Sequence, residues 1–176
     1  MFRGDFTVDI NRETYLELME RRLKNYFDLE ENKLINNKVF DLYGKYHMML
    51  GRTFLSKTDI IDKFETNEHV MIKCVPHLTQ EDLERYLAYL NELPEKVVSL
   101  NQYHKSTYIN AVLVCEDYIA CDLKTIKKFK YEKIFGFYFR GFCEVRLMVV
   151  ELPTSKVFTN RDGKRVKKAY EPFYKK

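Results

Sequence analysis

Residues 108–115 read Tyr-Ile-Asn-Ala-Val-Leu-Val-Cys, a run in which almost every side chain is apolar. Such a run is typical of a central β-strand that is buried on both faces. Working outward, the alternation of apolar and polar residues at 39–50 predicts one further strand, and segments 69–75 and 142–151 predict two more. We therefore expect a sheet with residues 108–115 in its middle.

Helical patterns flank these strands. The first predicted helix runs from about Arg12 to Phe27 behind the N-cap residue Asn11. Its apolar stripe consists of Leu16, Met19, Leu23 and Tyr26. The second helix follows the capping pair Thr79 and Asp82 and ends at Pro94. Its apolar face consists of Leu83, Tyr86, Leu87 and Leu90. A short third helix is expected between residues 122 and 130.

Toward the C-terminus, residues 134–139 and 142–151 are predicted to be strands, and Asp162-Gly163 is predicted to be the turn of a final hairpin. The order of elements indicates an α+β fold. We expect a single domain, residues 1–176, with a largely antiparallel or mixed β-sheet covered by two to three helices. Residues 1–10 and 172–176 are candidate flexible ends.

The composition indicates a globular protein, since 45% of the 176 residues are hydrophobic and 32% are charged. No apolar run approaches the roughly 18–20 residues that span a bilayer, and the start of the chain lacks the features of a secretory signal. We therefore expect a cytoplasmic protein that does not enter a membrane. Its four cysteines are expected to be reduced, because no export signal accompanies them.

Sequence motifs for catalysis and cofactor binding are missing. The four Cys and four His residues lack the paired spacing of a zinc site, and the serines lie in no GxSxG context. The phosphate-binding loops GxxxxGK(S/T) and GxGxxG are both missing from the sequence. We therefore expect no metal and no cofactor, and the leading hypothesis is a non-enzymatic binding or interaction module. A minor alternative is a metal-dependent hydrolase built around Glu116, Asp117 and Asp122.

The expected order α-β-β-β-α-β resembles the core of the PD-(D/E)xK nuclease fold. That resemblance implies an acid on one strand and an acid-x-Lys sequence on the next, which together place a metal ion and a lysine at the scissile phosphate. Here the corresponding stretch reads Val70-Met71-Ile72-Lys73, so Met71 occupies the position of the acid. A nuclease-like protein is therefore only part of the minor alternative, the metal-dependent hydrolase.

The stretch from Arg140 to Leu147, Arg-Gly-Phe-Cys-Glu-Val-Arg-Leu, resembles the RNP1 strand of RRM domains. In that family a basic residue, a glycine and an aromatic ring begin a strand on which bases stack. Glu144 and Leu147 stand where the family places aromatic rings. An ordinary strand that follows an arginine-glycine turn is therefore the preferred interpretation.

Charge is distributed unevenly along the chain. Residues 1–120 contain 15 Lys/Arg and 20 Asp/Glu, whereas residues 121–176 contain 15 and 6, a net charge of +9. An excess of positive charge on one segment indicates an anionic partner, here nucleic acid or an acidic protein, although a solvated lysine surface also explains it. The alternative hypothesis is thus a nucleic-acid-binding protein. The candidate polyanion-binding residues are Lys124, Lys127, Lys128, Arg161, Lys164, Arg165, Lys167 and Lys168.

Residues 134–171 contain the stretches RGFCEVRLMVVEL and KVFTNRDGKRV and run into a third, AYEP, which ends at Pro172. This segment resembles the C-terminal signature of an uncharacterised bacterial protein family, which is a domain of unknown function. The resemblance implies no activity, ligand or catalytic residue.

Overall fold

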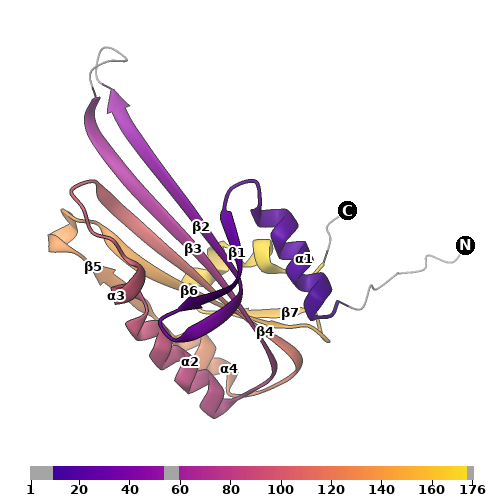
Figure 1. The fold of residues 1–176 in the computed structure, drawn as a ribbon. Coiled ribbons are helices and arrows are strands. Elements are labelled where there is room, and N and C mark those ends of the chain that lie inside the picture. Colours follow the sequence, from indigo (N-terminus) through magenta and orange to yellow (C-terminus); the bar gives the residue numbers. More distant parts are fainter. Residues whose placement is uncertain (1–9, 54–59, 174–176) are drawn as a thin grey trace, which may run out of the picture.

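The computed structural model of the protein describes residues 10–53 and 60–173, and one seven-stranded sheet lies at its centre (Figure 1). The strand order is β1-β2-β3-β4-β6-β5, and β7 pairs with β6. The strands are β1 (Asp28–Ile35), β2 (Lys38–Thr53), β3 (Ile60–Thr79), β4 (His104–Ala120), β5 (Tyr131–Ile134), β6 (Phe142–Glu151) and β7 (Lys156–Thr159). The helices are α1 (Arg12–Leu23), α2 (Gln80–Glu92), α3 (Pro94–Val97) and α4 (Leu123–Lys128), and the 3-10 turns are η1 (Gly136–Tyr138), η2 (Asp162–Arg165) and η3 (Lys167–Tyr170).

The sheet is mixed, as predicted. Strands β1, β2 and β3 form an antiparallel meander, whereas β4 runs parallel to both β3 and β6. Helices α2 and α3 make the crossover from β3 to β4, because parallel neighbours need a long connection. Strand β4 therefore has a parallel partner on each side, and its apolar residues Ile109–Cys115 are buried, as expected for a central strand.

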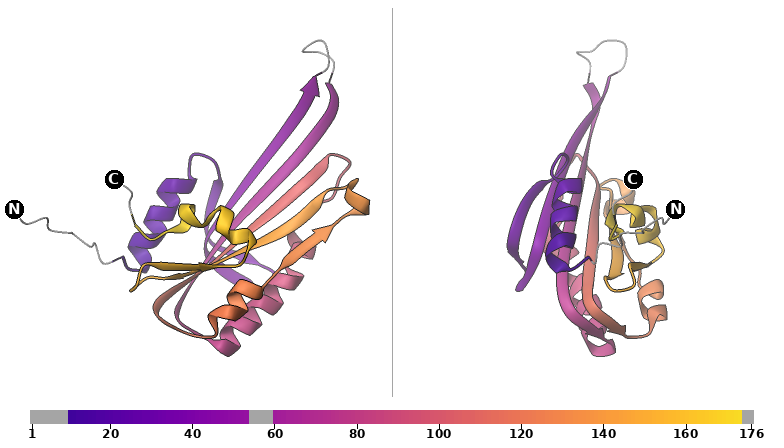
Figure 2. Two further views of the ribbon diagram at one scale, coloured as in Figure 1. Left: turned by 180° about the vertical axis from the view of Figure 1, so that it is seen from behind. Right: turned by 90° about the vertical axis from the view of Figure 1, so that its right-hand side faces the viewer.

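Helices pack on both faces of the sheet but toward one end of it (Figures 1 and 2). The core on one face includes Leu83 and Leu90 of α2 and Ile126 of α4. The core on the other face includes Tyr15 and Leu18 of α1. At the opposite end, β2 and β3 project beyond the helices (Figure 1). The fold is therefore dominated by the sheet, and the expectation that helices cover it is met only in part.

Helix α1 begins where its cap predicts. The Asn11 side chain accepts a hydrogen bond from the Thr14 amide at 2.9 Å, and the Thr14 hydroxyl lies 3.0 Å from the Asn11 amide. The predicted apolar stripe is wrong at one position: Tyr26 is 72% exposed, because the helix ends at Leu23. The buried side chains of α1 are Tyr15, Leu18, Met19 and Leu23.

Contacts from α1 hold the C-terminal segment in place. The Tyr15 hydroxyl donates a hydrogen bond to the carbonyl of Tyr170 at 2.9 Å. The Arg22 guanidinium donates to the carbonyls of Ala169 at 2.9 Å and Glu171 at 2.8 Å. The first helix and the last turn of the fold therefore close the same side of the sheet.

Helix α2 also begins where its cap predicts. The Thr79 hydroxyl accepts a hydrogen bond from the Asp82 amide at 3.2 Å, and the Asp82 carboxylate accepts one from the Thr79 amide at 3.4 Å. Leu83 and Leu90 are fully buried, whereas Leu87 is only half-buried.

Two strand predictions need correction, and one strand is not predicted at all. Strand β3 is much longer than the predicted segment 69–75, because Pro76 does not end it; the register with β4 shifts between Val75 and His77 instead. Sequence patterning does not reveal strand β1, since its residues are mostly exposed and include acids that obscure the alternation. The predicted strand 134–139 is replaced by the shorter Tyr131–Ile134, which is followed by η1.

The predicted hairpin at Asp162-Gly163 is wrong. Residues 156–159 do form a strand, β7, but it pairs with β6, and residues 162–165 form the turn η2. The Asn160 side chain explains the change of direction, because its Oδ1 accepts hydrogen bonds from the amides of Leu147 at 3.0 Å and Gly163 at 2.8 Å.

Of the candidate flexible ends, residues 1–9 and 174–176 lie outside the described residues. No described helix has the length and apolar composition that a membrane crossing requires.

Candidate nucleic-acid interface

A groove of about 370 Å³ lies where β3, β4 and β6 have their ends near the turn η1. We call it the basic–aromatic groove. Its lining consists of Lys63, Phe64, Gln102, Tyr103, His104, Lys105, Phe139, Gly141 and Phe142. None of these residues is acidic, so the groove presents positive charge and aromatic rings together.

Lysine side chains in the groove lie over aromatic rings. The Lys105 ammonium is 4.8 Å from the ring centre of Phe64, and the Lys63 ammonium is 5.7 Å from that of Tyr103. Cations at such distances are attracted by the ring quadrupole. The rings therefore position the two ammonium groups, which remain on exposed residues.

The turn η1 exposes Phe137, and the residue after the turn, Phe139, is exposed in the lining of the groove. The side chain of Phe137 is 93% exposed and that of Phe139 is 90% exposed. Gly136 and Phe137 both have positive φ angles, 53° and 50°. For a bulky residue such as Phe this conformation is rare and costs about 1–2 kcal/mol. The turn is therefore strained, although its apolar side chains face solvent.

Buried contacts hold the floor of the groove. Gly141 has a φ of 72°, and a Cβ added there would lie 2.1 Å from the carbonyl oxygen of Lys105. His104 is buried, with Nδ1 at 2.6 Å from the carbonyl of Arg140 and Nε2 at 2.9 Å from the Thr107 hydroxyl. Because a carbonyl only accepts, Nδ1 carries the proton in the neutral ring. The starts of β4 and β6 are thereby locked together.

A second histidine lies next to the groove on the neighbouring strand. The Nδ1 of His47 is 2.9 Å from Asn67 Oδ1 and 3.3 Å from Glu65 Oε1. The Asn67 amide nitrogen donates to Glu65 at 3.1 Å, so its oxygen faces the histidine as an acceptor. The neutral ring therefore carries its proton on Nδ1 and leaves Nε2 as an acceptor on an exposed residue.

Glu65 is the centre of a polar cluster that also contains His47, Asn67 and Asn101. Burial by itself raises the pKa of Glu65, but hydrogen bonds from the side chains of Asn101 and Asn67 outweigh it and hold the pKa below its ordinary value. An ionised carboxylate that orients an imidazole can assist proton transfer or the binding of an anion by the protonated ring.

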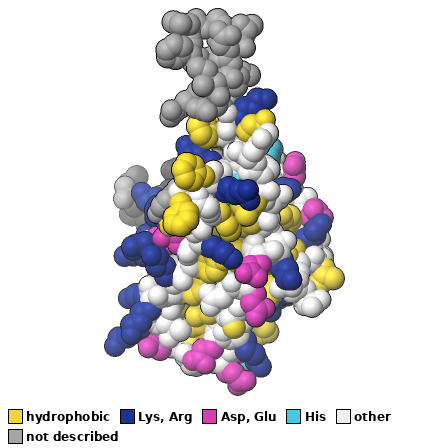
Figure 3. All heavy atoms as spheres, turned by 90° about the vertical axis from the view of Figure 1, so that its left-hand side faces the viewer, with side chains coloured by type: hydrophobic (Ala, Val, Ile, Leu, Met, Phe, Trp, Pro, Cys, Tyr) yellow, Lys and Arg dark blue, Asp and Glu magenta, His cyan; other side chains and the backbone are white. Residues whose placement is uncertain are grey.

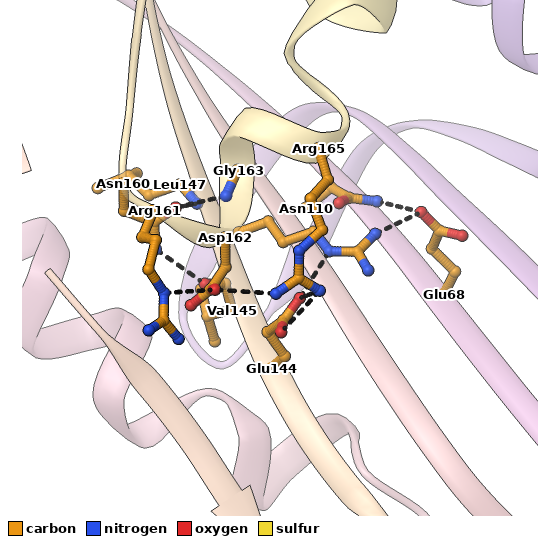
Figure 4. A network of polar contacts seen from close by, with 11 residues as sticks. Glu68, Asn110, Glu144, Val145, Leu147, Asn160, Arg161, Asp162, Gly163 and Arg165 are labelled. Atoms are coloured by element: carbon orange, nitrogen blue, oxygen red, sulfur yellow. Dashed lines mark hydrogen bonds and ion pairs between the residues drawn. The ribbon is translucent and has the colours of Figure 1, made fainter. Parts of the chain in front are cut away.

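A separate polar network joins β3, β4, β6 and the turn η2 (Figure 4). Glu144, which is 5% exposed, accepts a hydrogen bond from Arg146 Nε at 2.8 Å and pairs with Arg165 at 3.4 Å. Arg165 also bridges to Asp162 at 3.1 Å. Glu144 therefore takes the position of an aromatic ring in the RNP1 resemblance but serves as a buried ion-pair partner.

The predicted polyanion-binding residues fall into two groups. Arg161 and Arg165 pair with the buried carboxylate of Asp162, so part of their charge is compensated. Lys164 and Lys168 are exposed, whereas Lys167 is half-buried. The lysines of α4, which are Lys124, Lys127 and Lys128, are exposed as well. Helix α4 packs against β7, and β7 contacts both η2 and η3, so all of these residues lie on neighbouring elements.

The acids of the minor alternative do not form a cluster. Glu116 is half-buried and Asp117 is exposed, while Asp122 serves as the N-cap of α4 through a 2.9 Å hydrogen bond from the Lys124 amide. Within residues 10–53 and 60–173, no three His, Cys, Asp or Glu side chains are grouped to hold a metal ion.

The region that corresponds to a nuclease site is occupied by a structural ion pair. Met71 is fully buried in the core. Asp41 lies 3.7 Å from Lys73, also pairs with Arg12, and accepts a hydrogen bond from the Cys74 amide at 2.7 Å. With its carboxylate already compensated by two cations, Asp41 has little capacity for a metal ion.

The four cysteines are free and mostly buried. Burial raises the pKa of Cys74 and that of Cys143 to about 12, so neither is a reactive thiolate at neutral pH.

Comparison with known proteins identifies a family but no activity. No curated protein and no solved structure matches the chain. Residues 11–172 match the model of a family described as a domain of unknown function, DUF8052. This agrees with the resemblance noted at residues 134–171 and extends it to nearly the whole chain. The protein therefore belongs to the DUF8052 family.

Proposed function

We propose that the chain is a binding module for single-stranded nucleic acid, with the basic–aromatic groove as the main contact. The observation that carries the proposal is the combination of Lys63 and Lys105 with aromatic rings in a groove that has no acidic lining residue. Proteins that bind single strands combine positive grooves with rings on which bases stack.

The exposed rings of the turn η1 support stacking. Phe137 and Phe139 have almost their whole surface free, and Phe139 also lines the groove. Each base stacked on an aromatic side chain contributes about 1–3 kcal/mol to binding. Such a contact also accounts for a strained turn that brings no gain in core packing.

The basic C-terminal third supports phosphate contacts in the same proposal. Seen from the side of β5, Lys and Arg side chains form a column along one margin, below exposed hydrophobic side chains (Figure 3). Lys164 and Lys168 are exposed residues of this third, and a nucleic-acid backbone that leaves the groove would meet such cations. Arg161 and Arg165 contribute less, because Asp162 compensates them.

Saturated polar groups favour binding over catalysis. Both ring nitrogens of His104 have partners, and the carboxylates of Glu144 and Asp162 are each paired with arginine. A catalytic acid or base needs a free position toward its substrate. His47 retains such a position, and it lies at the margin of the cluster rather than in the groove lining.

Fluorescence anisotropy with a labelled single-stranded RNA of about 16 nucleotides tests the proposal at low salt. We expect Phe139→Ala to weaken binding about tenfold, since the variant lacks one stacking ring. The matched control is Tyr118→Ala, an aromatic residue that is 54% exposed near the far end of β4. It should leave the affinity unchanged.

Three outcomes contradict the proposal. One is the absence of RNA binding at low salt. Another is an equal loss of affinity in Phe139→Ala and Tyr118→Ala. The third is binding of poly-glutamate as tight as that of RNA, which would indicate an acidic protein as the partner.

A further inference from the structure

The outer edge of β2 has a long stretch without a strand partner. Strand β1 pairs with β2 from Lys38 to Lys45, and among the described residues no other strand pairs with this edge beyond Lys45. The inner edge remains paired with β3 through the same region, so the strand conformation is maintained. Backbone N–H and C=O groups of the edge are therefore available to a further strand.

The residues of this edge lack the features that usually prevent association. From Tyr46 to Gly51 the sequence reads Tyr-His-Met-Met-Leu-Gly, with no Lys, Arg, Asp, Glu or Pro. Met49 is 45% exposed and Leu50 is 53% exposed. Natural edge strands are normally protected by charges, by proline or by bulges. The stretch from Tyr46 to Gly51 contains no charged residue, no proline and no bulge.

Two other edge strands of the sheet, β1 and β5, are protected. Strand β1 carries Asp28, Glu30, Glu31 and Lys33, and its pairing is interrupted at Asn32, which has a φ of 51°. Strand β5 has only four residues, and two of them, Glu132 and Lys133, are charged. The contrast distinguishes β2 from these two edge strands.

We propose that two copies of the chain associate through this edge, with their β2 strands antiparallel about a two-fold axis at Met49. Residues that face each other across an antiparallel pair must point to the same side of the sheet. The sequence numbers of two residues that face each other across the pair must therefore differ by an even number. Register with β3 is regular as far as Arg52, so the longest symmetric pairing covers residues 46–52 and has Met49 at its centre.

The sequence is complementary to itself in this register. The half-buried Met48 lies opposite the exposed Leu50 of the second copy, and Met49 lies opposite Met49, so apolar side chains cover one another. His47 lies opposite Gly51, which leaves room for the imidazole. A second copy thus places apolar side chains over the exposed Met49 and Leu50 and a glycine opposite the His47 ring. This match argues for self-association over pairing with an unrelated strand.

The association does not depend on the proposed function, but it would affect it. Leu50 and Gly51 pair directly with Phe64 and Lys63 of β3, which line the basic–aromatic groove. A joined sheet would therefore carry two grooves on one continuous structure. Two linked sites bind a long strand more tightly than either does alone.

Sedimentation velocity over a range of concentrations tests the proposal. The wild-type chain of 21.3 kDa should approach twice that mass as its concentration rises. Met49→Lys and Met49→Asp should each be monomeric, because like charges would face each other on the axis. An equal mixture of the two variants should form a heterodimer, because the opposed charges then attract.

The matched controls are Leu34→Lys and Leu34→Asp, which change a 62% exposed residue of the protected edge strand β1 and should leave the dimer intact. Circular dichroism establishes that each variant is folded. If the charged variants fail to fold, Met49→Cys gives an independent readout, since mild oxidation should link two copies, whereas Leu34→Cys should stay unlinked.

Several results would overturn the proposal. These are a wild-type chain that remains monomeric at every concentration, single Met49 variants that remain dimeric, and a mixture that fails to associate. A Met49→Cys variant that links no more readily than Leu34→Cys would overturn it as well.

Discussion

The backbone of Gly141 lies so close to Lys105 that a methyl group on Gly141 would come within 2.1 Å of the Lys105 carbonyl oxygen. The φ of 72° at Gly141 adds a second reason for glycine. We expect Gly141→Ala to lower the free energy of unfolding by about 2–5 kcal/mol, which combines a left-handed conformation with overpacking. Gly136→Ala is the control: its φ is similar, but the nearest atom would be 3.5 Å away. Equal losses in urea denaturation would contradict the explanation.

Leu90 and Leu87 of α2 differ in burial although they share one predicted face. Leu90 is fully buried and Leu87 is half-buried. Leu90→Ala should therefore cost about 2–5 kcal/mol of unfolding free energy, and Leu87→Ala about 1 kcal/mol. Chemical denaturation of both variants measures the difference. A larger loss in Leu87→Ala would show that the packing of α2 is different.

Stability should fall between about pH 6.5 and pH 4 because of His69. Burial, and to a smaller extent Lys45, lowers the pKa of His69 from 6.5 to about 4. The unfolded chain therefore takes up a proton at a pH where the folded chain does not, and stability is lost as the pH falls through this window. Across this window His69 lowers the free energy of unfolding by at most about 3 kcal/mol.

The comparison with His69→Gln isolates this effect from other titrating groups. Urea denaturation across the same pH window should show a smaller pH dependence in the variant than in the wild-type chain. Parallel curves for the two proteins would contradict the assignment to His69.

RNA binding should become less dependent on salt when lysines of the C-terminal third are removed, of which Lys164 and Lys168 are exposed and Lys167 is half-buried. Replacing Lys164, Lys167 and Lys168 with Ala should reduce the slope of log affinity against log salt by about 0.7 for each lysine that neutralises a phosphate in the wild-type complex. Arg165 is left unchanged, because its removal would deprive Glu144 and Asp162 of a partner. Lys24→Ala, at the end of α1, serves as the control. An unchanged slope in the triple variant would exclude these residues as phosphate ligands.

Thiol modification should be slow in the folded chain. Burial raises the pKa of Cys143 to about 12 and also raises that of Cys121, which is the least buried of the four cysteines. We expect Cys121 to react first with a thiol reagent at mildly alkaline pH, and the others at least about a hundredfold more slowly than a free thiol. Rapid reaction of all four in the native protein would contradict the burial described.

The central part of the fold is predictable because its signals are local. The apolar run at 108–115 identifies a strand buried on both faces, and the reciprocal caps at Asn11 and Thr79 mark the starts of two helices. Strand β1 and the length of β3 are not predictable in this way. Both depend on pairing with neighbouring strands. Strand β1 forms despite its acidic composition, and β3 continues past Pro76.

The candidate site depends on contacts that sequence patterns do not reveal. The density of basic residues around η2 is visible in the sequence, but the compensation of Arg161 and Arg165 by Asp162 requires the turn that Asn160 creates. The dense aromatic stretch Phe135–Phe139 is also visible. Its composition favours a strand, whereas the positive φ angles at Gly136 and Phe137 turn the chain and expose the rings.

The hydrogen bonds from Tyr15 and Arg22 to the carbonyls of residues 169–171 have a consequence for biosynthesis. Helix α1 is translated before every strand of the sheet, whereas the segment that covers it is translated after all of them. During elongation the apolar side of α1 therefore lacks its final cover, and the N-terminal portion of the chain cannot complete its fold by itself. Closure of this side of the sheet thus waits until residues 169–171 have emerged from the ribosome.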